Sequence, residues 1–573
     1  MEFKKDKLAI IFLIILLVLG TYLRFTDYDT IGYSSDSLLT VAGGLAWFYP
    51  LPYFPGLVYM GPPLGNIIIG TGCMLSGEDF SGVSQAHQIF SPDLPILIGQ
   101  KMVNAEPYCK APIYFFGLIF FLLLSILAIL LFRSYYALFP IAFFTFSQFI
   151  LEWSRVISVD IISYVFIFLG LIFLWKAYNE DKESKKENLF FILTFISLGF
   201  AGATKLSAGV YLFFALIFFI EKYWQETKLL IKKILKIIKI NIADKLNVPS
   251  EINITPIIKK GSVYFLLYLF ALLIPYKLNP KNFFDVLVGF KKIAPEISSL
   301  KITLNIFTII HEFLMKINEL DFLIFLFSLF IFLRLLFKKD KEKNEKFILY
   351  FVLILIFGAT FFESTWLFRV AIPLLVSIIL LMGLAFSNKE YSIFSLLKIQ
   401  TEKRKKIFYI FLSIYILFSL LVTISHAPYY FRGNEVVCSF EKENCNQMVI
   451  GELYSKAVKP TMTFLSPILN DNETFLYLES AIPIVYARQN DSLQHLNFDN
   501  YVQQKLGRLS TIQEKIQYFK PDGREIRYYI PIRWYVKDSE SDIFKKEYLP
   551  NYIIRLDNTD VIKVYDLYNL TKK

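Results

Sequence analysis

The chain has 573 residues, of which 55% are hydrophobic, 17% are aromatic and only 19% are charged. A soluble domain carries about 45–50% apolar and about 25% charged residues, so this composition excludes an ordinary soluble enzyme and excludes disorder over most of the length. The net charge of +11 would suggest a nucleic-acid partner in a soluble protein. In a chain this apolar it indicates cationic loops that face an anionic membrane leaflet, with no nucleic acid as partner.

Eleven apolar runs approach the length of about 17–25 residues that a membrane-spanning helix needs. They lie at about residues 8–22, 113–132, 137–152, 158–177, 189–203, 207–221, 262–279, 321–337, 346–363, 368–386 and 407–425. The first run follows three lysines but no small-x-small cleavage site, so we interpret it as a retained span with a cytoplasmic N-terminus. Residues 189–220 are divided near Lys205, because small and polar residues interrupt the run and a lysine within a membrane is costly.

Lysine and arginine gather in alternate loops, as the positive-inside rule expects of cytoplasmic loops. The basic clusters lie at residues 182–186, 222–260, 338–346 and 403–406. With eleven spans all four fall on one side, which places the N-terminus inside and the C-terminus outside. The opposite side then holds the long first loop, residues 23–112. Residues 222–250 alternate Lys with Leu and Ile and are expected to lie as a basic amphipathic helix on the inner membrane surface.

Residues 426–573 differ in composition from residues 1–425, because polar and aromatic residues replace the apolar runs. The segments TFLYLES, PIVYARQ, REIRYYIPIRWYV and the pair NYIIRL/VIKVYDL are typical of strands, and the run 499–519 has a helical pattern. Asp522-Gly523 and Asp557-Asn558 indicate turns. The expected fold class is therefore a polytopic α-helical membrane protein over residues 1–425, followed by an extracytoplasmic α/β domain.

The four cysteines, Cys73, Cys109, Cys438 and Cys445, all fall on the expected outer side, where disulfides persist. They are too few for a disulfide-scaffold fold, and no CxxC is present. Cys438 and Cys445 are close enough in sequence to close a small loop. Two free thiols are the alternative.

The first outer loop is about 90 residues long and rich in aromatic residues, Gly and Pro, which favours a functional role over disorder. It contains Asp27, Asp29 and Asp36 just outside the membrane. Asp36 precedes the apolar stretch SLLTVAGGLAWF and so lies near a helix N-terminus, where the dipole favours its ionised form. Such a carboxylate can take a proton from an acceptor hydroxyl or hold a divalent cation. The alternative is a simple helix N-cap.

Short motifs follow one another along residues 8–385. They are Arg24 at the end of the first span, Asp36 opening a helix, Pro62-Pro63-Leu64 followed by Gly77, Ser154-Arg155 followed by Asp160, Gly199 with Lys205 and Gly209, and Arg369 before Pro373. This order resembles the GT-C glycosyltransferases, and more narrowly the protein O-mannosyltransferase and aminoarabinose-transferase group. The chain departs from that pattern at Ser37, where the family has Glu, at Gly61, and in an added stretch at about 80–110. The W-W-D-x-G signature of oligosaccharyltransferases is absent.

The resemblance implies a GT-C-like fold in the cell membrane and an inverting transfer of a sugar from a polyprenyl- or dolichyl-phosphate donor. The acceptor would be a hydroxyl of a protein, lipid or glycan at the outer face. Asp36 would orient and deprotonate the acceptor. The cations expected to bind the donor phosphate are Arg155, Lys205 and Arg369, and the supporting residues are Arg24, Pro62, Pro63 and Asp160. Arginine suits such sites because its guanidinium contacts phosphate through two parallel hydrogen bonds.

Each candidate cation also has a structural interpretation. Arg155 could pair with Glu152 or Asp160, and Asp160 could be the partner of Arg155 or of Lys205. Lys205 could extend to the lipid headgroups, and Arg369 could pair with Glu363. His311-Glu312, before the eighth span, is a weak candidate for a metal site, so a divalent metal ion is the only cofactor considered.

Two other functions remain open from the sequence. One is a transporter or flippase of polyprenyl-linked glycans, although such proteins often show internal repeats and acids within spans, and neither is evident here. The other is an inactive relative whose outer domain binds a partner, because Ser37 replaces an acid of the family pattern.

Overall fold

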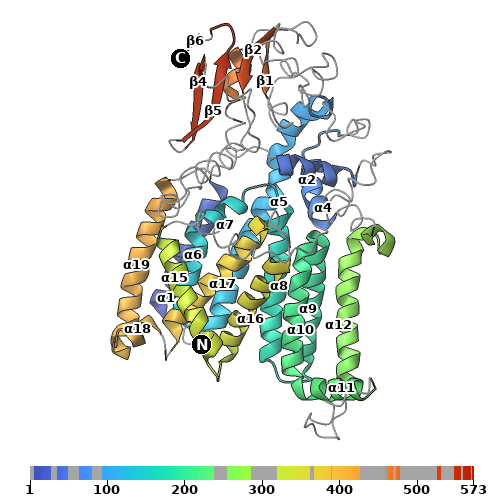
Figure 1. The fold of residues 1–573 in the computed structure, drawn as a ribbon, viewed down its shortest axis with the longest axis vertical. Coiled ribbons are helices and arrows are strands. Elements are labelled where there is room, and N and C mark those ends of the chain that lie inside the picture. Colours follow the sequence, from blue (N-terminus) through green and yellow to red (C-terminus); the bar gives the residue numbers. More distant parts are fainter. Residues whose placement is uncertain are drawn as a thin grey trace.

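The computed structural model describes residues 6–26, 35–48, 63–80, 93–237, 255–284, 319–361, 367–388, 390, 392–425, 459, 461, 463–468, 473–477, 525–530, 548–556, 559–569 and 571–572. Helices run side by side through the first 425 residues, and a small sheet lies beyond one end of this bundle (Figure 1). The α-helices are α1 (Lys7–Phe25), α2 (Ser35–Leu45), α4 (Pro63–Met74), α5 (Asp93–Phe132), α6 (Leu138–Phe146), α7 (Gln148–Trp153), α8 (Val159–Asn179), α9 (Lys185–Thr204), α10 (Val210–Lys222), α11 (Trp224–Ile237), α12 (Thr255–Leu273), α15 (Glu319–Phe337), α16 (Lys343–Phe361), α17 (Leu367–Ser387), α18 (Ile393–Leu396) and α19 (Thr401–Ser425).

Every apolar run expected to span the membrane contains helix in the described residues. Within the described ranges, six helices are long and apolar enough to cross a membrane, and a seventh crossing results if Leu206–Lys222 and Trp224–Lys233, bent by 97°, count as one. Four further apolar helices are shorter: Pro63–Met74, Tyr135–Phe146, Phe322–Phe337 and Ile372–Ser387. The chain is thus a multi-pass helical membrane protein, while eleven crossings and the N-in/C-out orientation stay predictions.

Two breaks in the helices have local causes. The expected break near Lys205 is present: α9 ends at Thr204, and Lys205 takes an extended backbone before the 3₁₀ turn Leu206–Gly209. The run 137–152, expected as one span, is instead divided into α6 and α7. Ser147 leaves the helical conformation there, and its side chain caps α7 by accepting a hydrogen bond from the Ile150 amide at 3.5 Å.

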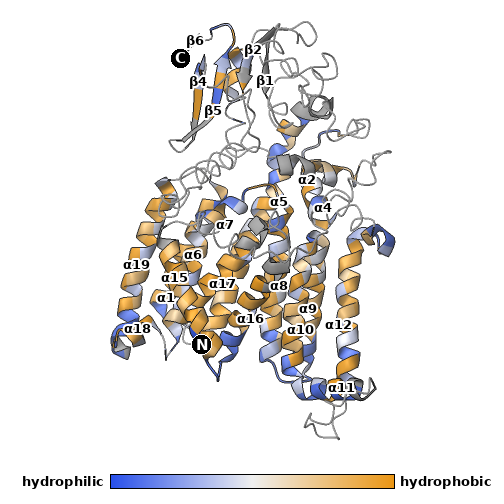
Figure 2. Ribbon diagram, in the orientation of Figure 1, coloured by the Kyte–Doolittle hydropathy of each residue, from blue (hydrophilic) through white to orange (hydrophobic). Residues whose placement is uncertain are grey.

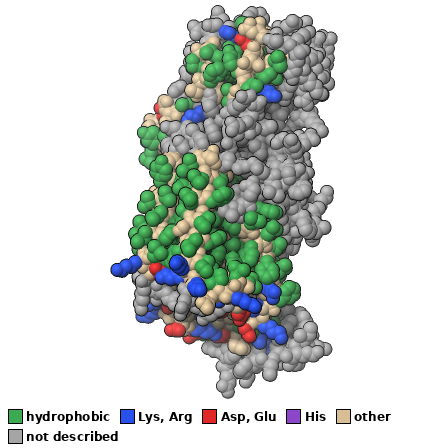
Figure 3. All heavy atoms as spheres, turned by 90° about the vertical axis from the view of Figure 1, so that its left-hand side faces the viewer, with side chains coloured by type: hydrophobic (Ala, Val, Ile, Leu, Met, Phe, Trp, Pro, Cys, Tyr) green, Lys and Arg blue, Asp and Glu red, His purple; other side chains and the backbone are tan. Residues whose placement is uncertain are grey.

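The four basic loops share one end of the bundle: ion pairs connect the first three across the sequence, and the fourth pairs with the N-terminal residues, which lie at the same end (Figure 1). Lys346 pairs with Glu221 at 2.7 Å, Lys405 with Asp6 at 2.8 Å, Lys222 with Glu187 at 3.3 Å, and Lys182 with Glu226 at 3.1 Å. We call this the basic end. Helix α11 lies across it (Figure 2), as expected for a basic amphipathic helix at a membrane surface. Charged side chains gather beneath a broad hydrophobic face (Figure 3).

The C-terminal sheet has the strand order β1-β2-β5-β4, and β1 and β2 are parallel while the other neighbours are antiparallel. The strands are β1 (Glu473–Tyr477), β2 (Glu525–Ile530), β4 (Tyr552–Leu556) and β5 (Thr559–Asp566), with a separate pair β3 (Tyr548–Leu549) and β6 (Thr571–Lys572). Ile562 and Val564 share one face of β5 and are buried, and the following residue, Tyr565, is buried as well. The segment PIVYARQ, the helical run 499–519, Cys438 and Cys445 lie outside the described residues, so the α/β character and that disulfide stay predictions.

Candidate functional site

Arg155 lies in the turn between α7 and α8, and its side chain is fully buried. Its Nη2 donates to the backbone carbonyl of Leu23 and to Thr26 Oγ1, the latter at 2.9 Å. Both acceptors belong to the last turn of α1 and the residue after it. The end of the first helix therefore holds this guanidinium at the end of the bundle opposite the basic loops.

Arg24 is a second fully buried guanidinium in the same place. Its Nη1 donates to the Gly20 carbonyl at 2.8 Å, its Nη2 donates to the Phe144 carbonyl at 3.0 Å, and its Cζ lies 4.2 Å from the ring centroid of Phe121. Nε is buried and has no hydrogen-bond partner among the described residues. Arg24 thus binds α1 to α5 and α6, which suits a supporting role.

Lys205 forms a buried ion pair with Asp160, and the two residues are 5% and 1% exposed. Asp160 stands in the first turn of α8, where the helix dipole favours a carboxylate. Ser158 donates to Asp160 Oδ2 at 2.6 Å and caps the helix by accepting from the Asp160 amide at 3.2 Å. The ammonium is therefore held inside the protein instead of extending to lipid headgroups, and Lys205 is one of the two partners expected for Asp160.

Helices α2 and α4 bring the first-loop motifs to the same place. Ser37, the residue after Asp36, is buried and donates to the Ile157 carbonyl at 3.2 Å, two residues beyond Arg155. A Cβ on Gly65 of α4 would lie 2.7 Å from Val159 and 3.0 Å from Thr204. The first turn of α4 is therefore inserted between the start of α8 and the end of α9, next to the Asp160–Lys205 pair.

The remaining expected residues are placed less completely. Pro63 opens α4 and is buried, whereas Pro62, His311 and Glu312 lie outside the described residues. The side chains of Asp36 and Arg369 are likewise not described, although the backbones lie in the first turns of α2 and α17. Helix α17 reaches the basic end, where Asn388 donates to Glu345, so its first turn lies at the opposite end.

The site carries an excess of buried positive charge. Arg24, Arg155 and Lys205 are opposed by the buried carboxylates of Glu152 and Asp160, which leaves one net positive charge among these five side chains. Arg24 and Arg155 are also close enough to repel each other. Such an arrangement favours an anionic ligand, and phosphate is one of the anions that guanidinium groups contact through two parallel hydrogen bonds. Within the described ranges there is no group of three His, Cys, Asp or Glu side chains that could hold a metal ion.

A disulfide that the sequence interpretation did not propose supports this site. Cys73 in α4 and Cys109 in α5 are bonded across 36 residues, and both are fully buried. Next to the disulfide, Gly72 packs closely against the backbone carbonyl of Tyr108. The disulfide closes the loop that contains the added stretch at about 80–110. The sequence offered one indication of this bond: both cysteines lie in the first outer loop, and most of the added stretch lies between them.

Helices α2 and α4 pack through glycine, which leads to a test of their contact. A Cβ on Gly44 would lie 2.2 Å from the Asn66 carbonyl oxygen and 2.8 Å from Gly70 Cα, so Gly44→Ala must separate two backbones. We expect a destabilisation at the upper end of the about 1–3 kcal/mol typical of overpacking, measured as a lower melting temperature of the purified protein. Gly261→Ala is the matched control, because its nearest neighbour, Phe219, is 3.7 Å away. Equal melting temperatures for the two variants would contradict this packing.

The chain was compared with family models, curated sequences and solved structures. The family model described as dolichyl-phosphate-mannose-protein mannosyltransferase matches residues 14–278, a range that contains Arg24, Asp36, Arg155 and Lys205. No curated protein sequence matches the chain. Among solved structures, ArnT from Cupriavidus metallidurans bound to undecaprenyl phosphate is similar with a TM-score of 0.42 and 11% identity, and the match covers 97% of each chain. Apo ArnT matches with a TM-score of 0.45 and 11% identity over 97% of this chain and 98% of that one. AglB from Archaeoglobus fulgidus matches with a TM-score of 0.38 and 12% identity over 92% and 70%.

Proposed function

Residues 14–278 are a domain of the dolichyl-phosphate-mannose-protein mannosyltransferase family, and from this premise we propose an inverting transfer of one sugar to a hydroxyl acceptor at the outer membrane face. The chain is a membrane glycosyltransferase that depends on a polyprenyl- or dolichyl-phosphate sugar. The proposal adds three finer points: inversion at the anomeric carbon, a hydroxyl acceptor, and the end of the bundle at which the reaction occurs.

In the proposed reaction the acceptor hydroxyl attacks the anomeric carbon from the face opposite the phosphate. The new C1–O bond forms as the C1–O bond to phosphate breaks, and the electron pair leaves with the phosphate. Positive charge develops on the sugar ring, as in glycoside hydrolysis. Asp36 orients the hydroxyl and accepts its proton. The products are the glycosylated acceptor and the polyprenyl phosphate.

The leaving phosphate gains negative charge as the bond breaks, and fixed cations that are already in place stabilise that charge. Arg155 and Lys205 are assigned to this role, together with Arg369. Arg24 supports them by fixing the end of α1 on which Arg155 depends. A phosphodiester donor carries one negative charge and the released monoester about two near pH 7, so an excess of buried positive charge favours the product side of the bond-breaking step.

The hydrogen bond from Ser37 to the Ile157 carbonyl is the observation that supports the proposal most strongly. It joins α2, whose first turn contains Asp36, to the turn that contains Arg155, although 120 residues separate Ser37 from Ile157. A general base and a phosphate-binding cation must lie within reach of one sugar, and this contact brings their backbones together. It also gives Ser37, which replaces an acid of the family pattern, a structural role.

The test is a transfer assay with the full chain in lipid nanodiscs, radiolabelled dolichyl-phosphate mannose as donor, and a panel of protein, lipid and glycan acceptors. We expect labelled product, release of dolichyl phosphate, and inverted anomeric configuration by NMR. Uptake of the labelled lipid into vesicles without transfer would support the transporter alternative. Absence of transfer from several polyprenyl-phosphate sugars to every acceptor would favour an inactive relative.

A further inference from the structure

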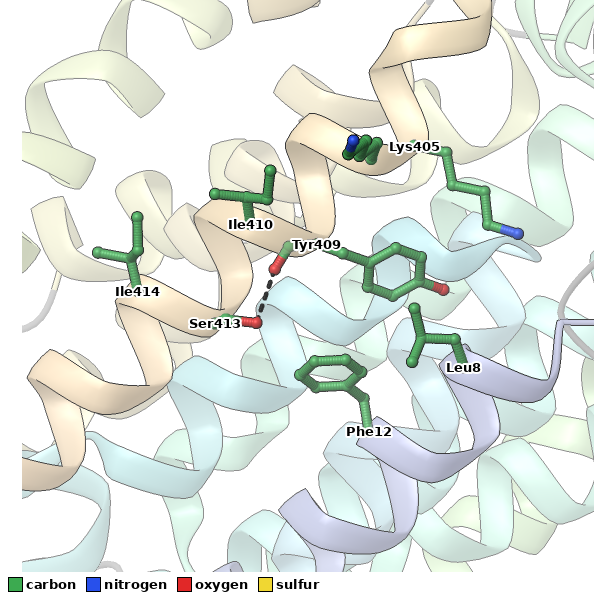
Figure 4. Close-up of a pocket in the computed structure, with 8 residues that line it drawn as sticks. Leu8, Phe12, Lys405, Tyr409, Ile410, Ser413 and Ile414 are labelled. Atoms are coloured by element: carbon green, nitrogen blue, oxygen red, sulfur yellow. Dashed lines mark hydrogen bonds between the residues drawn. The ribbon is translucent and has the colours of Figure 1, made fainter.

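A groove at the basic end lies far from the site described above. It has a volume of about 610 Å³ and runs between the start of α1 and the first turns of α19 (Figure 4). The side chains that line it are Leu8, Phe12, Lys405, Lys406, Tyr409, Ile410, Ser413 and Ile414. We call it the α1–α19 groove. None of these residues takes part in the proposed sugar transfer.

One part of the groove is apolar and open to the surroundings of the protein. Leu8, Ile410 and Ile414 are 43%, 52% and 63% exposed, an exposure that is favourable only in contact with hydrocarbon. Phe12 and Tyr409 stack at a centroid distance of 5.5 Å and close the groove from the inside. Ser413 is small and leaves room between these side chains. Its hydroxyl donates to the Tyr409 carbonyl at 2.9 Å (Figure 4), so an alkyl chain could pass without leaving that hydroxyl unsatisfied.

The other part of the groove is cationic. Lys405 pairs with Asp6 at 2.8 Å, and Tyr409 donates to the same carboxyl at 2.9 Å. Burial acts to raise the pKa of Asp6, but the hydrogen bonds from Lys405 and Tyr409 outweigh it and lower the pKa, so the carboxyl stays ionised. Lys406 is exposed and forms no ion pair with any described residue. Lys405 and Lys406 against Asp6 leave one net positive charge at the mouth.

The order of these residues along α19 matches the shape of a phospholipid. Lys406, Ile410 and Ser413 follow at intervals of four and three residues, so they share one face of the helix, with the charge at the end of the helix and the apolar residues towards its middle. Phospholipids place an anionic phosphate at the membrane surface and alkyl chains below it. Anionic lipids attract basic segments at such surfaces by an amount that corresponds to about a fivefold effect for each lysine.

We propose that the α1–α19 groove binds one anionic bilayer phospholipid, with its phosphate at Lys405 and Lys406 and one acyl chain along Phe12, Ile410, Ser413 and Ile414. The bound lipid fills the space between the first and last helices of the bundle. It thereby holds α19, the helix that leads to the C-terminal sheet, against α1. This site is independent of the sugar-transfer proposal.

Native mass spectrometry of the full chain tests the charge. The detergent-purified protein is titrated with phosphatidylglycerol or with phosphatidylcholine of the same acyl chains. We expect the first phosphatidylglycerol to bind at least tenfold more tightly than phosphatidylcholine, and Lys406→Gln to weaken its binding about fivefold. Lys185→Gln is the matched control, because Lys185 is an exposed lysine at the same end of the bundle but outside the groove. Equal binding of the two lipids, or equal losses in the two variants, would overturn the proposal.

Ser413→Phe tests the shape without changing the charge. The larger side chain fills the apolar part of the groove from an exposed position of α19, so folding should be preserved. We expect loss of the tightly bound phosphatidylglycerol and a melting temperature that no longer rises when this lipid is added. Unchanged lipid binding in Ser413→Phe would overturn the assignment. A dimer that Ser413→Phe dissociates would overturn it as well, because a second copy of the chain would then be the occupant.

Discussion

Replacing Asp36 with asparagine is expected to lower the rate of sugar transfer by about 10²–10⁴-fold, the usual contribution of a general base. Asparagine keeps the size and the hydrogen-bonding oxygen of the side chain but cannot accept the proton of the acceptor hydroxyl. The neighbouring contact from Ser37 to Ile157 is unaffected, so the helix start stays beside the Arg155 turn. The measurement is the initial rate with dolichyl-phosphate mannose, together with the melting temperature of the purified variant.

The design of this experiment separates catalysis from helix capping. Asp36 is the second residue of α2, where short polar side chains still suit the start of a helix, so Asp36→Asn and Asp36→Ser should keep the helix start and should both be inactive. If both variants transferred sugar at the wild-type rate while Asp36→Ala lost stability, Asp36 would stabilise the helix start and would not be the base. Ser37→Ala, which removes only the hydrogen bond to Ile157, should retain a larger share of the activity than Asp36→Asn.

Local chemistry explains the parts of the fold that could be predicted from the sequence. The break at Lys205 follows from the cost of a lysine inside a run of apolar residues, and the antiparallel pairing of β4 with β5 follows from two strand patterns that are separated by Asp-Asn. The bundle itself follows from the lengths of the apolar runs. The alternation of basic loops along the chain was enough to predict that these loops share one side, and the ion pairs at the basic end agree with this prediction.

The contacts that could not be predicted depend on packing between segments that are far apart in the sequence. Asp160 could have paired with Arg155 or Lys205, and only the packing of α8 against α9 places the ammonium beside it. Nothing along the sequence indicated that the carbonyl of Leu23 and the hydroxyl of Thr26 would hold Arg155. The Cys73–Cys109 bond likewise depends on α4 lying against α5. The division of the run 137–152 was missed because one serine within apolar residues is a weak signal.

The Asp160–Lys205 pair offers a test of whether Lys205 acts on the donor or only on the fold. Lys205→Met removes the cation that pairs with the buried Asp160 carboxylate, and Asp160→Asn removes the carboxylate that pairs with the buried Lys205 ammonium. Removing one partner of a buried ion pair costs about 3–5 kcal/mol. Each single variant should therefore give less folded protein and a lower melting temperature. The double variant Asp160→Asn/Lys205→Met removes both charges and should regain most of that stability.

The double variant is nevertheless expected to transfer sugar at least about 10²-fold more slowly than the wild type, because a preorganised charge that acts on a developing anion contributes roughly this much. The matched control is Lys338→Met/Glu345→Gln, which removes an ion pair of 3.0 Å with a buried carboxylate at the basic end and should leave the transfer rate unchanged. A folded Asp160→Asn/Lys205→Met protein with the wild-type rate would reduce the pair to a structural contact. Phosphate binding would then rest on Arg155 and Arg369, and a loss of donor affinity in Arg155→Lys would be the next requirement.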